Sequence, residues 1–346
     1  MSRVTKDTFY EVIDFAKLTE FITEYQYRVN TQDVANNNRL RNTRDDHILR
    51  HLKTILNDIT TVKFNFFNGP RFCIKVKYDF SKNTPNLGRL YPVNYNSLIT
   101  VEKNIRNAIS PDYIDIDIVS CHPVILIHYA KKYGIQCKYL QDYNEHREQY
   151  LKKLMDIGLT RADAKQLMLR LIFTGKLRNF CKEKDISIDI MPSEVVNFEK
   201  EIQRLSRYIS SEQDLSWFFT KVQESERSNW QASALSLFLQ DTERRILEIM
   251  INYIHKNIPD AYNTLSLQYD GFMILKKFYS NALLHKLENE VYNDIGISIK
   301  LDTKTPMSRF NNICSTHCCI TVVMIIWLLI LIFGIMNFVY AFYKNN

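Results

Sequence analysis

The 346-residue chain is long enough for two or three domains with sizeable cores, which excludes a peptide or a disulfide-stapled miniprotein. Hydrophobic residues make up 46% and charged residues 24% of it, with only 8 Gly and 8 Pro, so we expect ordered and mostly helical structure. The formal charge of +7 permits a polyanionic partner without requiring one.

The first 60 residues have a helical pattern, and its second half is basic. Five cations follow an Asn-rich turn there: Arg39, Arg41, Arg44, Arg50 and Lys53. Such a helix face can contact phosphate groups or lie in solvent, and both interpretations stay open. Residues 62–80 then alternate in two segments joined by Asn68-Gly69-Pro70, which predicts a hairpin.

The rest of the chain predicts short elements followed by a long helical region. In order, we expect a loop at 81–92, a short helix at 101–111, a strand at 113–119, a helix at 123–133, helices over 136–255 with a break near Met191-Pro192, and a strand-turn-strand at 265–275.

Two of the predicted strand segments carry aspartates that could bind a metal. Alternation in the strand at 113–119 places Asp115 and Asp117 on one face. Carboxylates this close are costly when buried unless a cation such as Mg²⁺ or Mn²⁺ neutralises them, and a solvated strand face is the alternative. Asp270 lies at an Asp-Gly tip, a sequence typical of a type I′ turn without chemistry. If this tip faces Asp117, the pair could bind two metals about 4 Å apart for displacement at phosphorus.

A helix predicted at 159–173 carries a basic stripe. Its members are spaced by four: Arg161, Lys165, Leu169 and Phe173. The cations could hold a triphosphate while Phe173 stacks on a base. An amphipathic helix with its basic end in solvent would give the same pattern.

Five motifs in this order resemble family A DNA polymerases, and within them the shortened polymerases of virus-like transposons and large DNA viruses. They are GRLYP at 88–92, IRNAISPDYIDIDIVSCHP at 105–123, R-x-x-x-K ahead of IFTG at 161–175, LQDTE at 239–243 and QYDGF at 268–272. The resemblance covers about residues 85–280 and implies an α+β right-hand fold with an antiparallel palm sheet. The implied divisions are a thumb-like region at 1–85, palm at 86–135, fingers at 136–235, palm at 236–308, and a juxtamembrane segment with a membrane tail at 309–346.

The resemblance also implies an activity, which is template-directed extension of a DNA primer with (deoxy)nucleoside triphosphates by two Mg²⁺ or Mn²⁺ ions in viral or mobile-element replication. The implied metal ligands are Asp117 and Asp270, with Asp115 beside them. The other implied site residues are Arg161 and the catalytic Lys165 on the phosphates, Phe173 near the templating base, and Arg89, Arg106, Gln240 and Tyr269 on the nucleic acid.

Two departures from the family pattern affect these expectations. His122 stands where the family has a glutamate against the sugar, which predicts weak discrimination against ribonucleotides. Gly271 stands where a second acidic residue is common, which leaves fewer metal ligands. A hypothesis of a different class is an inactive palm that binds nucleic acid or organises replication at a membrane, with any helicase supplied separately.

The C-terminal segment predicts a membrane anchor. Residues 320–343 carry no charge over 24 residues, about 36 Å of helix against a bilayer core of about 30 Å, although a buried core helix is the alternative. Without an apolar N-terminal segment we expect no secretory signal, and the preceding residues should stay cytosolic. Cys314, Cys318 and Cys319 surround His317 and could bind zinc or, beside a span, carry palmitate.

Overall fold

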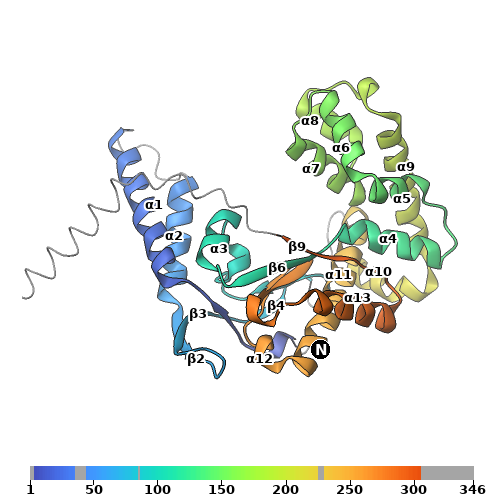
Figure 1. Ribbon diagram of the computed structural model, residues 1–346. Helices are drawn as coiled ribbons and strands as arrows, with labels where there is room; N and C mark the ends of the chain where they lie inside the picture. Colours follow the sequence, from blue (N-terminus) through green and yellow to red (C-terminus); the bar gives the residue numbers. More distant parts are fainter. Residues whose placement is uncertain (1–3, 36–43, 85, 225–229, 305–346) are drawn as a thin grey trace, which may run out of the picture. The chain divides into compact units, whose positions relative to one another are not determined.

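The computed structural model describes residues 4–35, 44–84, 86–224 and 230–304 (Figure 1). These residues form a mixed α+β structure that is mostly helical and has small antiparallel sheets, which confirms the predicted α+β class. Residues Met1–Lys304 group as one compact unit. The divisions predicted within the chain, at 85/86, 135/136, 235/236 and 308/309, stay predictions.

The strands of the described residues belong to three sheets, ordered β1-β3-β2, β4-β5 and β7-β8-β6-β9. Their bounds are β1 Phe9–Val12, β2 Ile59–Lys63, β3 Pro70–Val76, β4 Tyr78–Phe80, β5 Leu90–Pro92, β6 Tyr113–Ile118, β7 Ser266–Gln268, β8 Gly271–Leu275 and β9 Leu301–Lys304.

The helices come mainly from the middle of the chain, as predicted. Their bounds are α1 Phe15–Ala35, α2 Arg44–Asn57, α3 Lys103–Ile109, α4 Cys121–Lys132, α5 Lys138–Glu145, α6 Arg147–Asp156, α7 Arg161–Ile172, α8 Leu177–Lys184, α9 Ser193–Ser211, α10 Ser216–Glu224, α11 Trp230–Asn257, α12 Pro259–Tyr262 and α13 Asn281–Ile295. Short 3₁₀ helices are η1 Val4–Lys6, η2 Leu98–Thr100, η3 Ile188–Ile190, η4 Gln213–Leu215 and η5 Lys276–Phe278. Helix α9 begins directly after Met191-Pro192, where the break was expected.

The four-stranded sheet positions the candidate site. Strand β6 lies between β8 and β9, and Asp117 pairs with Gly271 on one side and with Asp302 on the other. Ile116 and Ile118 are buried in the core. Helix α4 follows β6 directly and packs against α11, which also contacts α13 (Figure 1). Residues that are far apart in the sequence, from α4 to β9, therefore surround the C-terminal end of β6.

The hairpin β7–β8 is confirmed, but its turn differs from the predicted type. Gln268 pairs with Gly271, so Tyr269 and Asp270 are the two turn residues. Neither has a positive φ, whereas a type I′ turn needs a positive φ at both. Gly271 is required instead by close approach, because a Cβ there would overlap the Ile116 carbonyl oxygen. For the same reason an acidic side chain could not replace it.

The N-terminal region departs from the helical prediction at its two ends. Phe9–Val12 forms β1 and Ile59 begins β2, both paired with β3. The β2–β3 pairing confirms the predicted hairpin, although β2 begins three residues before the predicted segment at residue 62. β5, at Leu90–Pro92, lies inside the predicted loop.

The predicted membrane span at 320–343 and the cluster of Cys314, Cys318, Cys319 and His317 lie outside the described residues and stay predictions. Within the described ranges, no helix is long and apolar enough to cross a bilayer.

Candidate functional site

A cavity of about 700 Å³ lies where β6 ends and α4 begins. Ser120 makes the turn between these elements with a φ of +50°, a left-handed conformation that is rare for non-glycine residues and is found often at functional sites. The ionisable side chains that line the cavity are Asp117, Glu243, Asp270, Asp302, Arg89, Arg147, Lys165, Lys304 and His122. The structure thus brings together five residues singled out in the sequence: Asp117, Asp270, Lys165, His122 and Arg89.

The two predicted metal-binding aspartates meet in this cavity because their strands are neighbours. Asp117 pairs with Gly271, the residue after Asp270, and the backbone N–H of Ile118 donates to the Asp270 carbonyl at 2.9 Å. Asp117 is 6% exposed, and its carboxylate contacts the ammonium of Lys304. Two acidic side chains therefore line one cavity, Asp117 from β6 and Asp270 from the adjacent β7–β8 turn.

Asp270 is the less neutralised of the two carboxylates. Burial raises the pKa of Asp270, and the negative charge of Glu243 raises it further. Among the described residues, no other side chain forms a hydrogen bond or an ion pair with its carboxylate. A desolvated carboxylate beside another negative charge favours a proton or a bound cation.

Glu243 contacts Arg89 and His122, and all three residues line the cavity. Its side chain is fully buried, and it accepts two hydrogen bonds from Arg89 Nη2 at 2.9 and 3.0 Å and one from Nε at 3.1 Å. His122 Nε2 lies 2.8 Å from Glu243 Oε2. A buried charge needs such partners, because an isolated carboxylate would be strongly destabilising.

Two predicted aromatic residues contact Arg89 and His122. The Arg89 guanidinium lies 4.6 Å from the centroid of the Tyr269 ring, and the His122 ring meets Phe173 edge-on at 5.1 Å. Phe173 is half-buried, and neither aromatic residue lines the cavity. In this structure they hold Arg89 and His122 in place.

The opposite side of the cavity is basic. Lys165 on α7 and Arg147 on α6 line it. Burial lowers the pKa of Lys165, and the positive charges of Arg161 and Arg147 lower it further. Arg161 does not line the cavity, since its guanidinium binds both Glu148 carboxylate oxygens at 2.7 Å on the surface. The stripe on α7 is therefore split, with Lys165 and Leu169 in the cavity and Arg161 outside.

Three further predicted residues lie outside the cavity. Asp115 shares a face with Asp117, but residues two apart on a strand are about 6.6 Å apart, and its carboxylate lies 3.8 Å from Arg106 instead. Arg106 also donates to Gln268 at 3.3 Å. Gln240 donates to Ser236 at 3.1 Å. Asp115 therefore lies outside the cavity that Asp117 and Asp270 line, and its role as a metal ligand stays a prediction.

The described cations of the basic face predicted near the N-terminus have partners within the protein: Arg44 and Arg50 pair with carboxylates, and Lys53 donates to the amide oxygen of Gln26. Arg44 pairs with Glu102 at 2.7 Å and Arg50 with Asp46 at 3.2 Å. Arg39 and Arg41 lie outside the described residues. The visible part of this face fits the solvated-helix interpretation.

Four residues of the cavity were missed in the sequence: Arg147, Glu243, Asp302 and Lys304. Glu243 ends the LQDTE motif, but it lies in a run of six polar residues at 240–245 that gives no sign of its burial. The other three lie in segments without a recognisable motif, and only the fold brings them to the cavity.

The carboxylates present suit a cation that also binds a phosphate. Among the described residues, no three His, Cys, Asp or Glu side chains are grouped so as to hold a metal by themselves. Mg²⁺ is commonly held by one or two carboxylates, with substrate phosphates and water supplying the remaining ligands. Asp117 and Asp270, which face two cations across the cavity, fit that pattern.

Comparison with known proteins finds a distant relative that is named as a putative helicase of a virophage. No protein-family model matches it. It is 30% identical over 246 residues to Putative helicase V13 of Sputnik virophage, and the match covers 68% of this chain and 30% of that protein. The chain therefore spans less than a third of the length of this relative, to which it is distantly homologous.

This similarity contradicts the predicted family A DNA polymerase and its primer-extending activity. This correction also removes the roles that depended on primer extension, namely the template and primer roles of Arg106 and Gln240 and the role of His122 against the sugar. The motifs misled for a physical reason. An aspartate strand, a turn aspartate and a basic helix stripe are what many metal–phosphate sites require, so their order along the chain does not define the reaction.

Proposed function

We propose that this chain is the metal-dependent nucleotide-binding part of a helicase-related viral replication protein, and that its cavity cleaves the phosphate chain of a nucleoside triphosphate. One observation carries the proposal: a single cavity of about 700 Å³ combines a carboxylate on β6 and a carboxylate in the adjacent β7–β8 turn with two cations on neighbouring helices. This is the charge pattern that a metal-bound triphosphate requires.

Asp117 and Asp270 would hold the Mg²⁺ or Mn²⁺ ion. Such an ion would neutralise negative charge on the phosphates when bound. Glu243 holds Arg89 and His122 in a buried hydrogen-bond network that lines the same cavity as these aspartates. The Asp270 carboxylate supports this assignment, because no other side chain of the described residues forms a hydrogen bond or an ion pair with it and burial raises its pKa.

Lys165 and Arg147 would bind the phosphate oxygens from the other side. Their helices, α6 and α7, pack against each other, so the two cations are presented together. The sequence contains no G-x-x-x-x-G-K-[ST] motif, the loop that cradles phosphates in P-loop enzymes. Phosphate binding is therefore assigned to these side chains.

The similarity to V13 supports a role beside nucleic acid. That protein is named as a putative helicase, and this chain spans 30% of it. We assign nucleotide cleavage to the cavity and leave strand separation to the rest of such a protein. The net charge of +7 suits a nucleic-acid partner.

The test is phosphate release from ATP and the other nucleoside triphosphates by the full chain, with Mg²⁺ or Mn²⁺ and with or without DNA. Asp117→Asn should lower kcat about 100-fold or more, because it removes charge where the metal–phosphate complex is stabilised. Lys165→Ala should weaken nucleotide binding about tenfold, as expected for the loss of a charged hydrogen bond.

Matched controls are Asp112→Asn and Lys152→Ala, which alter exposed side chains outside the cavity. Both should keep wild-type rates. The proposal is wrong if the wild-type chain neither binds nor cleaves any nucleoside triphosphate with a divalent cation, or if Asp117→Asn behaves like Asp112→Asn.

A further inference from the structure

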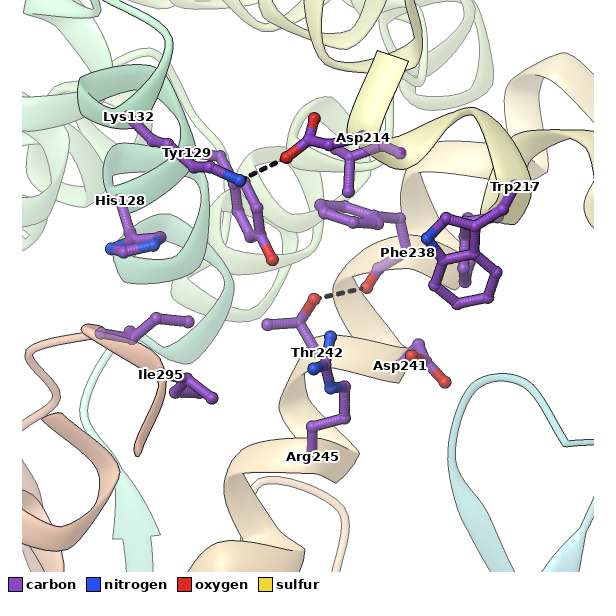
Figure 2. Close-up of a pocket in the computed structure, with 13 residues that line it drawn as sticks. His128, Tyr129, Lys132, Asp214, Trp217, Phe238, Asp241, Thr242, Arg245 and Ile295 are labelled. Carbon is purple, nitrogen blue, oxygen red and sulfur yellow. Dashed lines mark hydrogen bonds and ion pairs between the residues drawn. The ribbon is translucent and has the colours of Figure 1, made fainter. Parts of the chain in front are cut away.

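A second cavity, of about 560 Å³, lies on another face of α11 (Figure 2). Phe238, Thr242 and Arg245 line it at positions i, i+4 and i+7 of the helix and therefore share one side. Glu243, which belongs to the first cavity, points away from that side. The remaining walls come from α4, η4, α10 and the C-terminal end of α13.

The walls of the second cavity are rich in aromatic rings. Tyr129 meets Phe238 edge-on at 4.8 Å, and Phe218 meets Phe238 at 5.5 Å, so these buried rings fix one another. Trp217 differs from them because it is 52% exposed while lining the same cavity. Its indole offers a large apolar face at the entrance, with a rigid aromatic wall behind it (Figure 2).

Two cations at this cavity, Arg245 in its wall and Lys221 beside Trp217, are not paired with a carboxylate among the described residues. Lys132 is neutralised by Asp214 at 2.5 Å, and Asp241 by Arg244 at 3.1 Å. Arg245 extends toward Thr242 (Figure 2), is exposed, and has no hydrogen bond or ion pair to any other described residue. A second cation reinforces it: Lys221 Nζ lies 5.7 Å from the centroid of the Trp217 ring and likewise has no carboxylate partner in the described part of the chain.

We infer that this cavity binds an unpaired base of a single-stranded nucleic acid, with the base stacked on Trp217 and an adjacent phosphate bound by Arg245. An exposed indole beside free cations is the combination that binds single strands, since every base has a π-face and every linkage a negative charge. The bases of a duplex are already stacked and paired, so a duplex does not fit. The inference is independent of nucleotide cleavage in the first cavity.

The experiment measures binding of a fluorescein-labelled oligothymidine strand to the full chain by anisotropy. Trp217→Ala should weaken binding about tenfold, within the range seen for loss of one stacked base, whereas Trp217→Phe should retain most of it. Arg245→Ala should weaken binding and reduce the slope of log K against log salt by about one. Tyr208→Ala and Arg178→Ala, exposed side chains outside both cavities, serve as controls and should bind as the wild type does.

The inference is overturned if Trp217→Ala binds the strand as tightly as Tyr208→Ala does. It is also overturned if duplex DNA binds equally well, or if thymidine monophosphate displaces the strand at the same nucleotide concentration, since the site would then serve a free nucleotide. Trp217→Ala should leave phosphate release from ATP unchanged. If strand binding depends on Trp217 but no triphosphate is cleaved, only the proposed function falls.

Discussion

Substitution of Gly271 by alanine tests whether close contact between β8 and β6 builds the candidate site. A Cβ at this position would overlap the Ile116 carbonyl oxygen and lie 2.9 Å from the carbonyl carbon and 3.0 Å from Asp117 Cα. All three are backbone atoms inside a sheet, so no side-chain rotation relieves the clash. Overpacking costs about 1–3 kcal/mol, and each strand hydrogen bond lost adds about 1 kcal/mol. We expect Gly271→Ala to lower the free energy of unfolding by about 3 kcal/mol or more.

The assay is denaturant unfolding of Gly271→Ala against Gly134→Ala. Gly134 has a φ of +65° and nothing within 4 Å of a built Cβ, so its substitution carries only the left-handed backbone cost of about 1–2 kcal/mol. Gly271→Ala should also reduce triphosphate cleavage, because separating the strands moves Asp117 relative to Asp270. The reasoning is refuted if Gly271→Ala costs no more stability than Gly134→Ala.

Two further substitutions probe the charges of the cavity. Because the pKa of Asp270 is raised in the folded protein, ionisation of this carboxyl group lowers the free energy of unfolding. The stabilising contribution of the protonated group is present at low pH and is lost as pH rises through the raised pKa. Asp270→Asn should therefore raise the free energy of unfolding of the metal-free protein at neutral pH and lose this advantage in acid. The measurement is denaturant unfolding in the presence of a chelator. An Asp270→Asn variant that is less stable than Asp112→Asn at neutral pH would contradict this. Because the Lys304 ammonium contacts the Asp117 carboxylate, Lys304→Gln should tighten Mn²⁺ binding severalfold in calorimetric titration. The control Lys300→Gln, which alters an exposed side chain, should not change the affinity. Equal affinities of the two variants would exclude competition between Lys304 and the metal ion for Asp117.

Elements whose signal is local could be predicted from the sequence. β6 shows clear alternation, and the β7–β8 hairpin contains a two-residue turn between apolar runs. β1 and β9 are four residues each, FYEV and LDTK, too short to show a period. Their strand conformation depends on pairing with β3 and β6, which are distant in sequence. Such strands exist because of tertiary contacts, so local reasoning misses them.

The candidate site shows the same division. Asp117, Asp270 and Lys165 could be selected because each lies in a pattern that suits metal or phosphate binding. Glu243 could not be placed without knowing that α11 carries it beneath the hairpin, and Arg89 reaches it from 154 positions earlier in the chain. Partners at that separation leave no mark on local sequence.

The chemistry of the cavity and the reaction it serves are separate inferences. Carboxylates on a strand and on the neighbouring turn, in one cavity with cations from two helices, indicate metal-bound phosphates whichever bond is cleaved, because the charges to be neutralised are the same. The choice of reaction depends on what lies next to the phosphate: a second nucleotide, a water molecule or a nucleic-acid end. The sequence motifs described only the shared part, whereas similarity to V13 over 246 residues samples the surrounding structure as well. For this reason the homology outweighs the order of short motifs and contradicts the polymerase interpretation, whereas the helicase-related function remains our proposal.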